Sequence, residues 1–166
     1  ILVPATSANV GPGFDCLGIA LDLYNEIEYE YAGEPGDFEA EIIGEGNDSL
    51  SKGKDNLIYI SFKKTFDFSK KNPPGIKIKQ TNRIPLSRGL GSSSAAIVGG
   101  IVLANEILGN ILTMEEMLKI AVDIEGHPDN VAPALLGGFV ISFKENDDII
   151  SKKINVPEEI STTVIV

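Results

Sequence analysis

Residues 85–96 read Pro-Leu-Ser-Arg-Gly-Leu-Gly-Ser-Ser-Ser-Ala-Ala. Gly89 and Gly91 have no side chains, so the backbone can turn tightly there and come close to a ligand. The serines that follow open a long apolar segment that is typical of a helix. Because the first turn of a helix carries unpaired N–H groups and the positive end of the helix dipole, this stretch predicts a loop that holds phosphate.

The commoner phosphate-binding motifs do not match this loop. A P-loop requires a lysine after its second glycine, where this chain has Ser92, and a dinucleotide fingerprint requires a third glycine, where it has Ser94. A serine-capped turn would account for Gly-x-Gly alone but not for the whole run. The run resembles the ATP-binding motif of the GHMP kinases, which include galactokinase, homoserine kinase and mevalonate kinase. The resemblance implies an ATP site that comprises Pro85, Ser87, Arg88, Gly89, Leu90, Gly91, Ser92, Ser93, Ser94 and Ala95.

A second motif lies near the start of the chain. Residues 4–18 read Pro-Ala-Thr-Ser-Ala-Asn-Val-Gly-Pro-Gly-Phe-Asp-Cys-Leu-Gly, and their prolines and glycines predict that residues 1–18 form a structured loop. This run resembles the N-terminal signature of the homoserine kinase branch of the GHMP kinases. The resemblance implies that Asn9 and Asp15 bind the amino acid substrate, L-homoserine.

A third motif contains the single histidine of the chain. Residues 125–134 read Glu-Gly-His-Pro-Asp-Asn-Val-Ala-Pro-Ala, and the glycine and prolines predict a turn that leads into a strand at 138–143. A lone histidine is more often structural than functional, but this segment also resembles the homoserine kinases. The resemblance implies that His127 and Asn130 line the substrate pocket and that Glu125 completes a Mg²⁺ site with Ser93. The spacing from Glu125 to His127 is shorter than in some members of the family.

The resemblance also bears on the chemistry. Many GHMP kinases place an aspartate near the acceptor hydroxyl as a general base, whereas this motif offers Asn130, whose amide cannot accept a proton. Catalysis is therefore expected to rest on Ser93, Glu125 and Asn130 through proximity and electrostatic stabilisation.

The remaining segments predict an α+β fold with a mixed sheet and helices packed on one face. Strands are expected at 26–31 and 38–44, paired as a hairpin, and at 76–80; helices are expected at 56–68, capped by Asp55, at 95–108, and after a capping box of Thr113 and Glu116. Met114 and the apolar residues that follow it at helical spacing are expected in the core. Family resemblance adds the ribosomal protein S5 domain 2-like fold. It also implies that Asn56, in a Lys-Asp-Asn-Leu run, contacts adenine; a plain helix start is the alternative.

The two ends suggest a fragment. The chain opens on a strand-like Ile-Leu-Val, and residues 162–166 read as a strand in mid-course. We expect residues 1–155 to form the N-terminal ATP-binding domain and residues 156–166 to begin a ferredoxin-like C-terminal domain.

Composition limits the partners. A net charge of −10 argues against nucleic acid and anionic membranes, and the sequence contains no stretch of about 18 apolar residues. The single cysteine, Cys16, indicates a reducing, cytoplasmic setting. A homodimer remains open. Two other functions also remain open, namely another GHMP small-molecule kinase and a non-catalytic S5-like binding module, which would need a basic face if it bound RNA.

Overall fold

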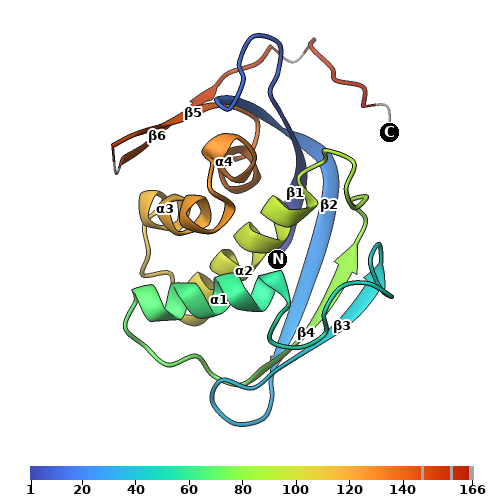
Figure 1. Ribbon diagram of the computed structural model, residues 1–166, viewed down its shortest axis with the longest axis vertical. Helices are drawn as coiled ribbons and strands as arrows, with labels where there is room; N and C mark the ends of the chain where they lie inside the picture. The colour runs from blue at the N-terminus through green and yellow to red at the C-terminus, as the bar shows by residue number, and fades with distance from the viewer. Residues whose placement is uncertain (147, 158, 165–166) are drawn as a thin grey trace.

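The structure is a computed structural model that describes residues 1–146, 148–157 and 159–164. Its elements follow one another as β1 (Leu2–Ala8), β2 (Leu17–Tyr31), β3 (Phe38–Gly44), α1 (Leu57–Phe68), β4 (Ile76–Asn82), α2 (Ser92–Ile107), α3 (Met114–Glu125), α4 (Pro128–Leu136), β5 (Phe139–Glu145) and β6 (Asp148–Ile154). The strands form one mixed, six-stranded sheet. Figure 1 shows the helices gathered on one side of this curved sheet, which confirms the predicted α+β class.

The long strand β2 holds the sheet together. It pairs antiparallel with β1, with β4 and, at its N-terminal end, with β5. Strand β3 pairs with β4 instead, in parallel. The predicted hairpin of residues 26–31 with 38–44 is therefore wrong, because β4 lies between the two strands. Helix α1 connects β3 to β4, and a parallel pair needs such a crossover where an antiparallel pair needs only a turn.

The N-terminal segment is more regular than the loop expected for residues 1–18, and the strand-like start of the chain does lead into a strand. Leu2–Ala8 is a strand, so the predicted loop shortens to residues 9–16. The ladder between β1 and β2 shifts register between Pro4 and Ala5, where proline has no N–H to donate. At the other end, residues 162–164 form no strand, and 165–166 lie outside the described residues.

The helix starts follow local capping, with two corrections to the predictions. Asn56, and not Asp55, caps α1, because its side chain accepts a hydrogen bond from the N–H of Ile58. The capping box of Thr113 and Glu116 is confirmed at α3, although Met114 is exposed and does not belong to the core.

Helix α4 replaces the predicted turn. Gly126 ends α3 in a left-handed conformation, and Pro128 then occupies the first turn of α4, where its missing N–H costs no hydrogen bond. Pro133 lies inside α4 and cannot donate to the carbonyl of Asp129. That carbonyl lies against Gly18 of β2, where a Cβ would come within 1.9 Å of it.

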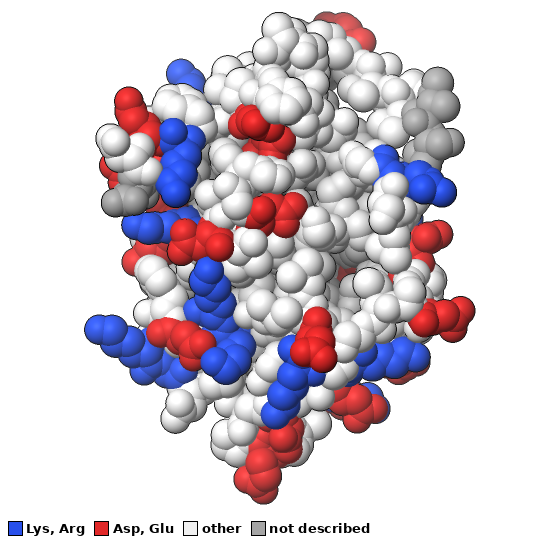
Figure 2. All heavy atoms as spheres, viewed as in Figure 1, with Lys and Arg blue, Asp and Glu red and all other residues white. Residues whose placement is uncertain are grey.

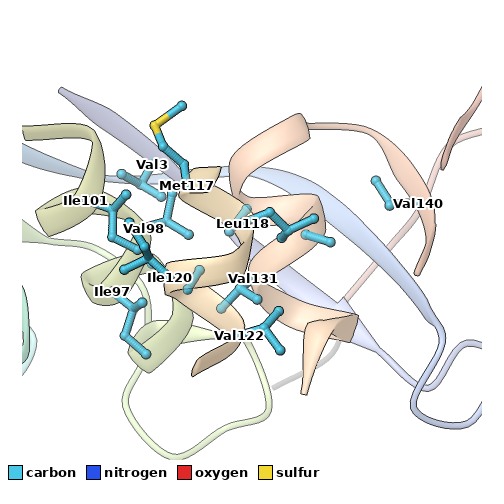
Figure 3. Close-up of a cluster of buried hydrophobic side chains, with 14 of the residues drawn as sticks. Val3, Ile97, Val98, Ile101, Met117, Leu118, Ile120, Val122, Val131 and Val140 are labelled. Atoms are coloured by element: carbon cyan, nitrogen blue, oxygen red, sulfur yellow. The ribbon is translucent and has the colours of Figure 1, made fainter. Parts of the chain in front are cut away.

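Two hydrophobic clusters fill the space between the sheet and the helices, and α2 contributes to both. The first joins α2, α3 and α4 to β1 and β5, and Figure 3 shows its side chains, among them Val98, Ile101, Leu118 and Val131. The second joins α1 and α2 to β2, β3 and β4. This position explains why α2 is apolar on every side. Among the described residues, no helix is long and apolar enough to cross a membrane.

The glycine pair of α2 provides a test of this packing. A Cβ on Gly100 would lie 2.2 Å from the backbone carbonyl oxygen of Ile58 in α1, whereas a Cβ on Gly99 would meet the flexible end of the Ile27 side chain at 2.5 Å. We expect Gly100→Ala to lower the free energy of unfolding by about 1 to 3 kcal/mol, because a helix backbone cannot move aside cheaply.

Gly99→Ala is the matched control in this experiment. Its gain in helix propensity, about 1 kcal/mol, opposes a small side-chain adjustment, so its stability should stay close to that of the parent. Urea denaturation of the two variants measures the difference. Equal stability of the two variants would contradict a close approach of α1 at Gly100.

Candidate functional site

A cavity of about 520 Å³ lies where the glycine-rich loop enters α2. Its walls come from the segment before α1, from β4, from the loop and the first turn of α2, from the end of α3 and from the start of α4. The lining residues are Leu50, Ser51, Asp55, Asn56, Leu57, Gln80, Pro85, Leu86, Ser87, Arg88, Gly89, Leu90, Gly91, Ser92, Ser93, Ser94, Ala96, Glu125 and Asn130. The loop residues predicted from the sequence, apart from the buried Ala95, therefore surround one cavity. The cavity is also lined by residues that the sequence motifs did not assign to the site, namely Leu50, Ser51, Gln80 and Leu86.

The loop is shaped by backbone conformations that glycine favours. Gly89 and Gly91 have φ values of 69° and 66°, and Ser87 adopts a similar value of 56°. Gly91 is the N-cap of α2 and provides no side-chain hydrogen bond, so the first-turn N–H groups of this helix have no side-chain cap. These unpaired N–H groups lie at the positive end of the α2 dipole, next to the loop, and both properties favour the binding of an anion.

Strand β1 packs against the glycine-rich loop through Thr6. The N–H of Thr6 donates to the carbonyl of Leu90 at 3.1 Å, and a Cβ on Gly91 would lie 1.9 Å from Oγ1 of Thr6. The same hydroxyl donates to Oδ1 of Asn130 at 2.8 Å. Thr6 thus joins the loop to the start of α4, a role that the sequence did not indicate because the two contacts lie far apart along the chain.

A carboxylate from α3 reaches the first turn of α2. Oε1 of Glu125 accepts hydrogen bonds from Oγ of Ser93 at 3.1 Å and from Oγ of Ser94 at 2.8 Å. Ser93 is exposed and Ser94 is buried, so the first hydroxyl can meet a ligand while the second holds the carboxylate in place. The structure therefore brings together the predicted pair of Ser93 and Glu125.

Asn56 lines the cavity, but its amide is already engaged within the protein. Its Oδ1 caps α1, and its Nδ2 donates to the carbonyl of Ser51 at 2.7 Å and to Oε1 of Gln80 at 3.4 Å. The residue is 5% exposed. The helix-start role is confirmed, and contact with adenine stays a prediction.

The residues predicted to bind the acceptor divide into three places. Asn130 lines the cavity, and His127 lies at the N-cap of α4, where Nδ1 is 2.5 Å from Oδ1 of Asp129. Asn9 and Asp15 form their own exposed turn, in which the N–H of Asp15 donates to Oδ1 of Asn9 at 2.8 Å. Neither residue of this turn lines the cavity.

Charges are mixed on the surface that Figure 2 shows. Lysine and arginine side chains there alternate with aspartate and glutamate and do not gather into a basic surface. Basic and acidic side chains also pair across strands of the sheet, for example Lys79 with Glu28 at 3.1 Å and Arg83 with Glu26 at 3.2 Å. This face lacks the basic character that an RNA-binding module would need.

The relatives that this chain matches belong to the group of proteins that its three sequence motifs resemble. The chain is 51% identical over 158 residues to the homoserine kinase of Carboxydothermus hydrogenoformans, an alignment that covers 95% of this chain and 51% of the relative. It is 53% identical over 167 residues to the homoserine kinase of Clostridium acetobutylicum, covering 100% of this chain and 55% of the relative. The chain spans about half the length of the curated relatives it matches.

Solved structures give the same fold. The homoserine kinase of Cytophaga hutchinsonii superimposes with a TM-score of 0.82 at 35% identity, over 94% of this chain and 51% of that one. The mevalonate kinase of Methanococcus jannaschii superimposes with a TM-score of 0.69 over 94% of this chain and 55% of that one, and its 21% identity supports the fold alone. Residues 56–138, which hold the glycine-rich loop and the helices α1, α2, α3 and α4, match the model of the GHMP kinases N terminal domain. This chain therefore belongs to the GHMP kinase family.

Proposed function

We propose that this chain is the ATP-binding part of a homoserine kinase. Such an enzyme transfers the γ-phosphoryl group of ATP to the hydroxyl of L-homoserine, giving O-phospho-L-homoserine in threonine biosynthesis. The observation that carries the proposal is the meeting of Glu125 with Ser93 and Ser94 at the first turn of α2, inside the cavity formed by the glycine-rich loop. We further propose that residues 1–155 form the ATP-binding domain and that residues 156–166 lead into a second domain.

The loop supplies what the phosphates of ATP require. Backbone N–H groups of residues 89–93 would hold the β- and γ-phosphates, and the positive end of the α2 dipole would stabilise their charge. Arg88 lines the same cavity and adds a cation. The adenine base would occupy the end of the cavity near Asn56 and Leu50.

The donor set fits Mg²⁺. A glutamate carboxylate and a serine hydroxyl are oxygen ligands of the kind that Mg²⁺ takes, usually one or two carboxylates together with phosphate oxygens and water. Among the described residues, no group of three or more His, Cys, Asp or Glu side chains is placed so that it could hold a metal ion by itself. Ser93 and Glu125 would hold the ion, which would neutralise charge on the phosphates.

Asn130 would orient the acceptor. Its Oδ1 accepts a hydrogen bond from Thr6, which fixes the amide at the cavity wall and leaves Nδ2 to donate to the homoserine hydroxyl. Because an amide cannot take the proton, we propose that rate comes from alignment and from charge stabilisation.

Substrate choice is the direct test of this proposal. The full-length gene product is assayed for ADP release with homoserine, mevalonate and galactose, each at saturating ATP and Mg²⁺. We expect turnover with homoserine at a kcat/KM at least about 10³-fold above the other two, because a site built to bind an ammonium group rejects substrates that lack one. Preference for mevalonate or galactose would assign another GHMP kinase, and absence of turnover with all three would favour a binding module.

A substitution in the exposed turn of residues 9–15 should affect the binding of homoserine and not that of ATP. Asp15→Asn removes the charge that would pair with the ammonium group of homoserine, while the turn that Asn9 caps through the backbone of Asp15 is kept. We expect KM for homoserine to rise about tenfold or more and KM for ATP to stay constant. Asp48→Asn, on another exposed turn, serves as the control. An increase in KM for ATP with an unchanged KM for homoserine would contradict this assignment and place Asp15 near the phosphates of ATP.

A further inference from the structure

Asp129 is a buried carboxylate that the reaction scheme above does not use. Its side chain is 2% exposed, and it lies in the first turn of α4, where the helix dipole favours a negative charge. Among the described side chains, the one that hydrogen-bonds it is His127, whose side chain is 50% exposed. Burying a carboxylate is costly unless it is paired. The hydrogen bond to His127 therefore stabilises Asp129 in its buried position and ties the two side chains together.

The geometry around Asp129 leaves it little freedom. Gly18 of β2 lies against its backbone carbonyl, where a Cβ would come within 1.9 Å, and Pro128 fixes the backbone just before it. His127 is the N-cap of α4, yet its side chain makes no capping hydrogen bond and turns to Asp129. A rigid acceptor thus faces one particular nitrogen, Nδ1, of an otherwise exposed ring.

We infer that Asp129 is a positioning residue that fixes the tautomer and the orientation of His127, so that the ring offers Nε2 as a hydrogen-bond acceptor to the acceptor substrate. A carboxylate can only accept, so the neutral imidazole must carry its proton on Nδ1, and Nε2 is left with a free lone pair. A lone pair at Nε2 suits a donor such as an ammonium or hydroxyl group and does not suit a carboxylate or phosphate. The inference rests on the proposed function, since an amino alcohol supplies such donors.

The tautomer can be tested without any activity. In long-range ¹H–¹⁵N spectra of the full-length gene product, recorded with the imidazole neutral, the signals of His127 are assigned by their loss in His127→Ala. We expect a pyrrole-type Nδ1 and a pyridine-type Nε2 in the parent, and a mixture of tautomers in Asp129→Asn, whose amide can donate as well as accept. A protonated Nε2 in the parent, or an unchanged tautomer in Asp129→Asn, would overturn the inference.

Kinetics separate positioning from a structural role. Loss of one oriented hydrogen bond to a charged group is expected to raise KM for homoserine about 10- to 100-fold in Asp129→Asn, with KM for ATP and kcat held within about threefold. In a His127→Ala background, Asp129→Asn should have no further effect, because Asp129 acts through the ring. Asp123→Asn, an exposed carboxylate on α3, is the control for the change in charge.

The possible failures are distinguishable. If Asp129→Asn damages α4, Asn130 is also displaced, and both kcat and the affinity for nucleotide fall. If Asp129→Asn raises KM for homoserine equally in the parent and in His127→Ala, Asp129 contacts the substrate directly. Either result would refute positioning through His127. If the parent does not turn over homoserine, the proposed function fails, while the tautomer measurement still decides the state of His127.

Discussion

Replacing Glu125 by glutamine is expected to lower kcat of the full-length gene product by about 10² to 10³, with little change in its thermal stability. Glutamine keeps the shape of the side chain and an oxygen that can accept hydrogen bonds from Ser93 and Ser94, so the local structure should survive. What is lost is the negative charge that would help to hold Mg²⁺ against the phosphates of ATP. Turnover at saturating Mg²⁺, together with the Mg²⁺ dependence of ATP binding by calorimetry, measures the effect.

Two variants make this experiment specific. Glu115→Gln removes an exposed carboxylate from the first turn of the same helix and should leave kcat within about twofold, since surface charges are screened. Ser93→Ala removes the exposed hydroxyl at the same point and should also cost about 10² to 10³ in rate. Retention of more than half of the parent kcat by Glu125→Gln or by Ser93→Ala would remove that residue from the proposed metal site.

Gly91→Ala is expected to reduce kcat/KM for ATP by about 10²-fold or more. A Cβ at this position would lie 1.9 Å from Oγ1 of Thr6, so the loop or β1 must move, and the backbone φ of 66° adds strain of about 1 to 2 kcal/mol for any residue with a side chain. A displacement of about 1 Å near the reacting groups is enough for a loss of this size. Thr6 also holds Asn130, so the acceptor side should suffer with the nucleotide side.

The matched control for Gly91 lies two residues earlier. Gly89 has nearly the same φ, 69°, but a Cβ there would meet no atom within 4 Å, so Gly89→Ala tests backbone strain alone and should cost about tenfold. If steric contact is decisive, Thr6→Ala should recover part of the lost ATP affinity when it is combined with Gly91→Ala; ATP binding is the readout, because Thr6→Ala also removes the hydrogen bond to Asn130 on the acceptor side. Equal effects of the two glycine substitutions, or no recovery in the double variant, would show that contact with Thr6 is not the cause.

Some features of this protein are local and could be predicted from the sequence. The Gly-x-Gly and serine run predicted a loop at a helix start, and the spacing of Thr113 and Glu116 predicted the capping box. Each depends on hydrogen bonds or steric limits within one turn of chain, which the residue types largely determine.

Other features were decided by the tertiary structure. Alternation in residues 26–31 and 38–44 showed two strands but not their partners, because a period of two is the same whichever strand lies alongside. Likewise, nothing in the motif of residues 4–18 indicated that Thr6 would join the glycine loop to Asn130, 124 residues away.

The site itself shows the same division. Family resemblance selected Ser93 and Glu125, but their meeting across 32 residues depends on how α3 packs against α2. The sequence by itself determined which short segments can cap a helix, turn, or offer N–H groups to an anion, because those properties arise from neighbouring residues. Only the tertiary structure decided which of these segments share a cavity and which carboxylate holds His127, because such contacts depend on the order of strands and on packing between elements far apart in the chain.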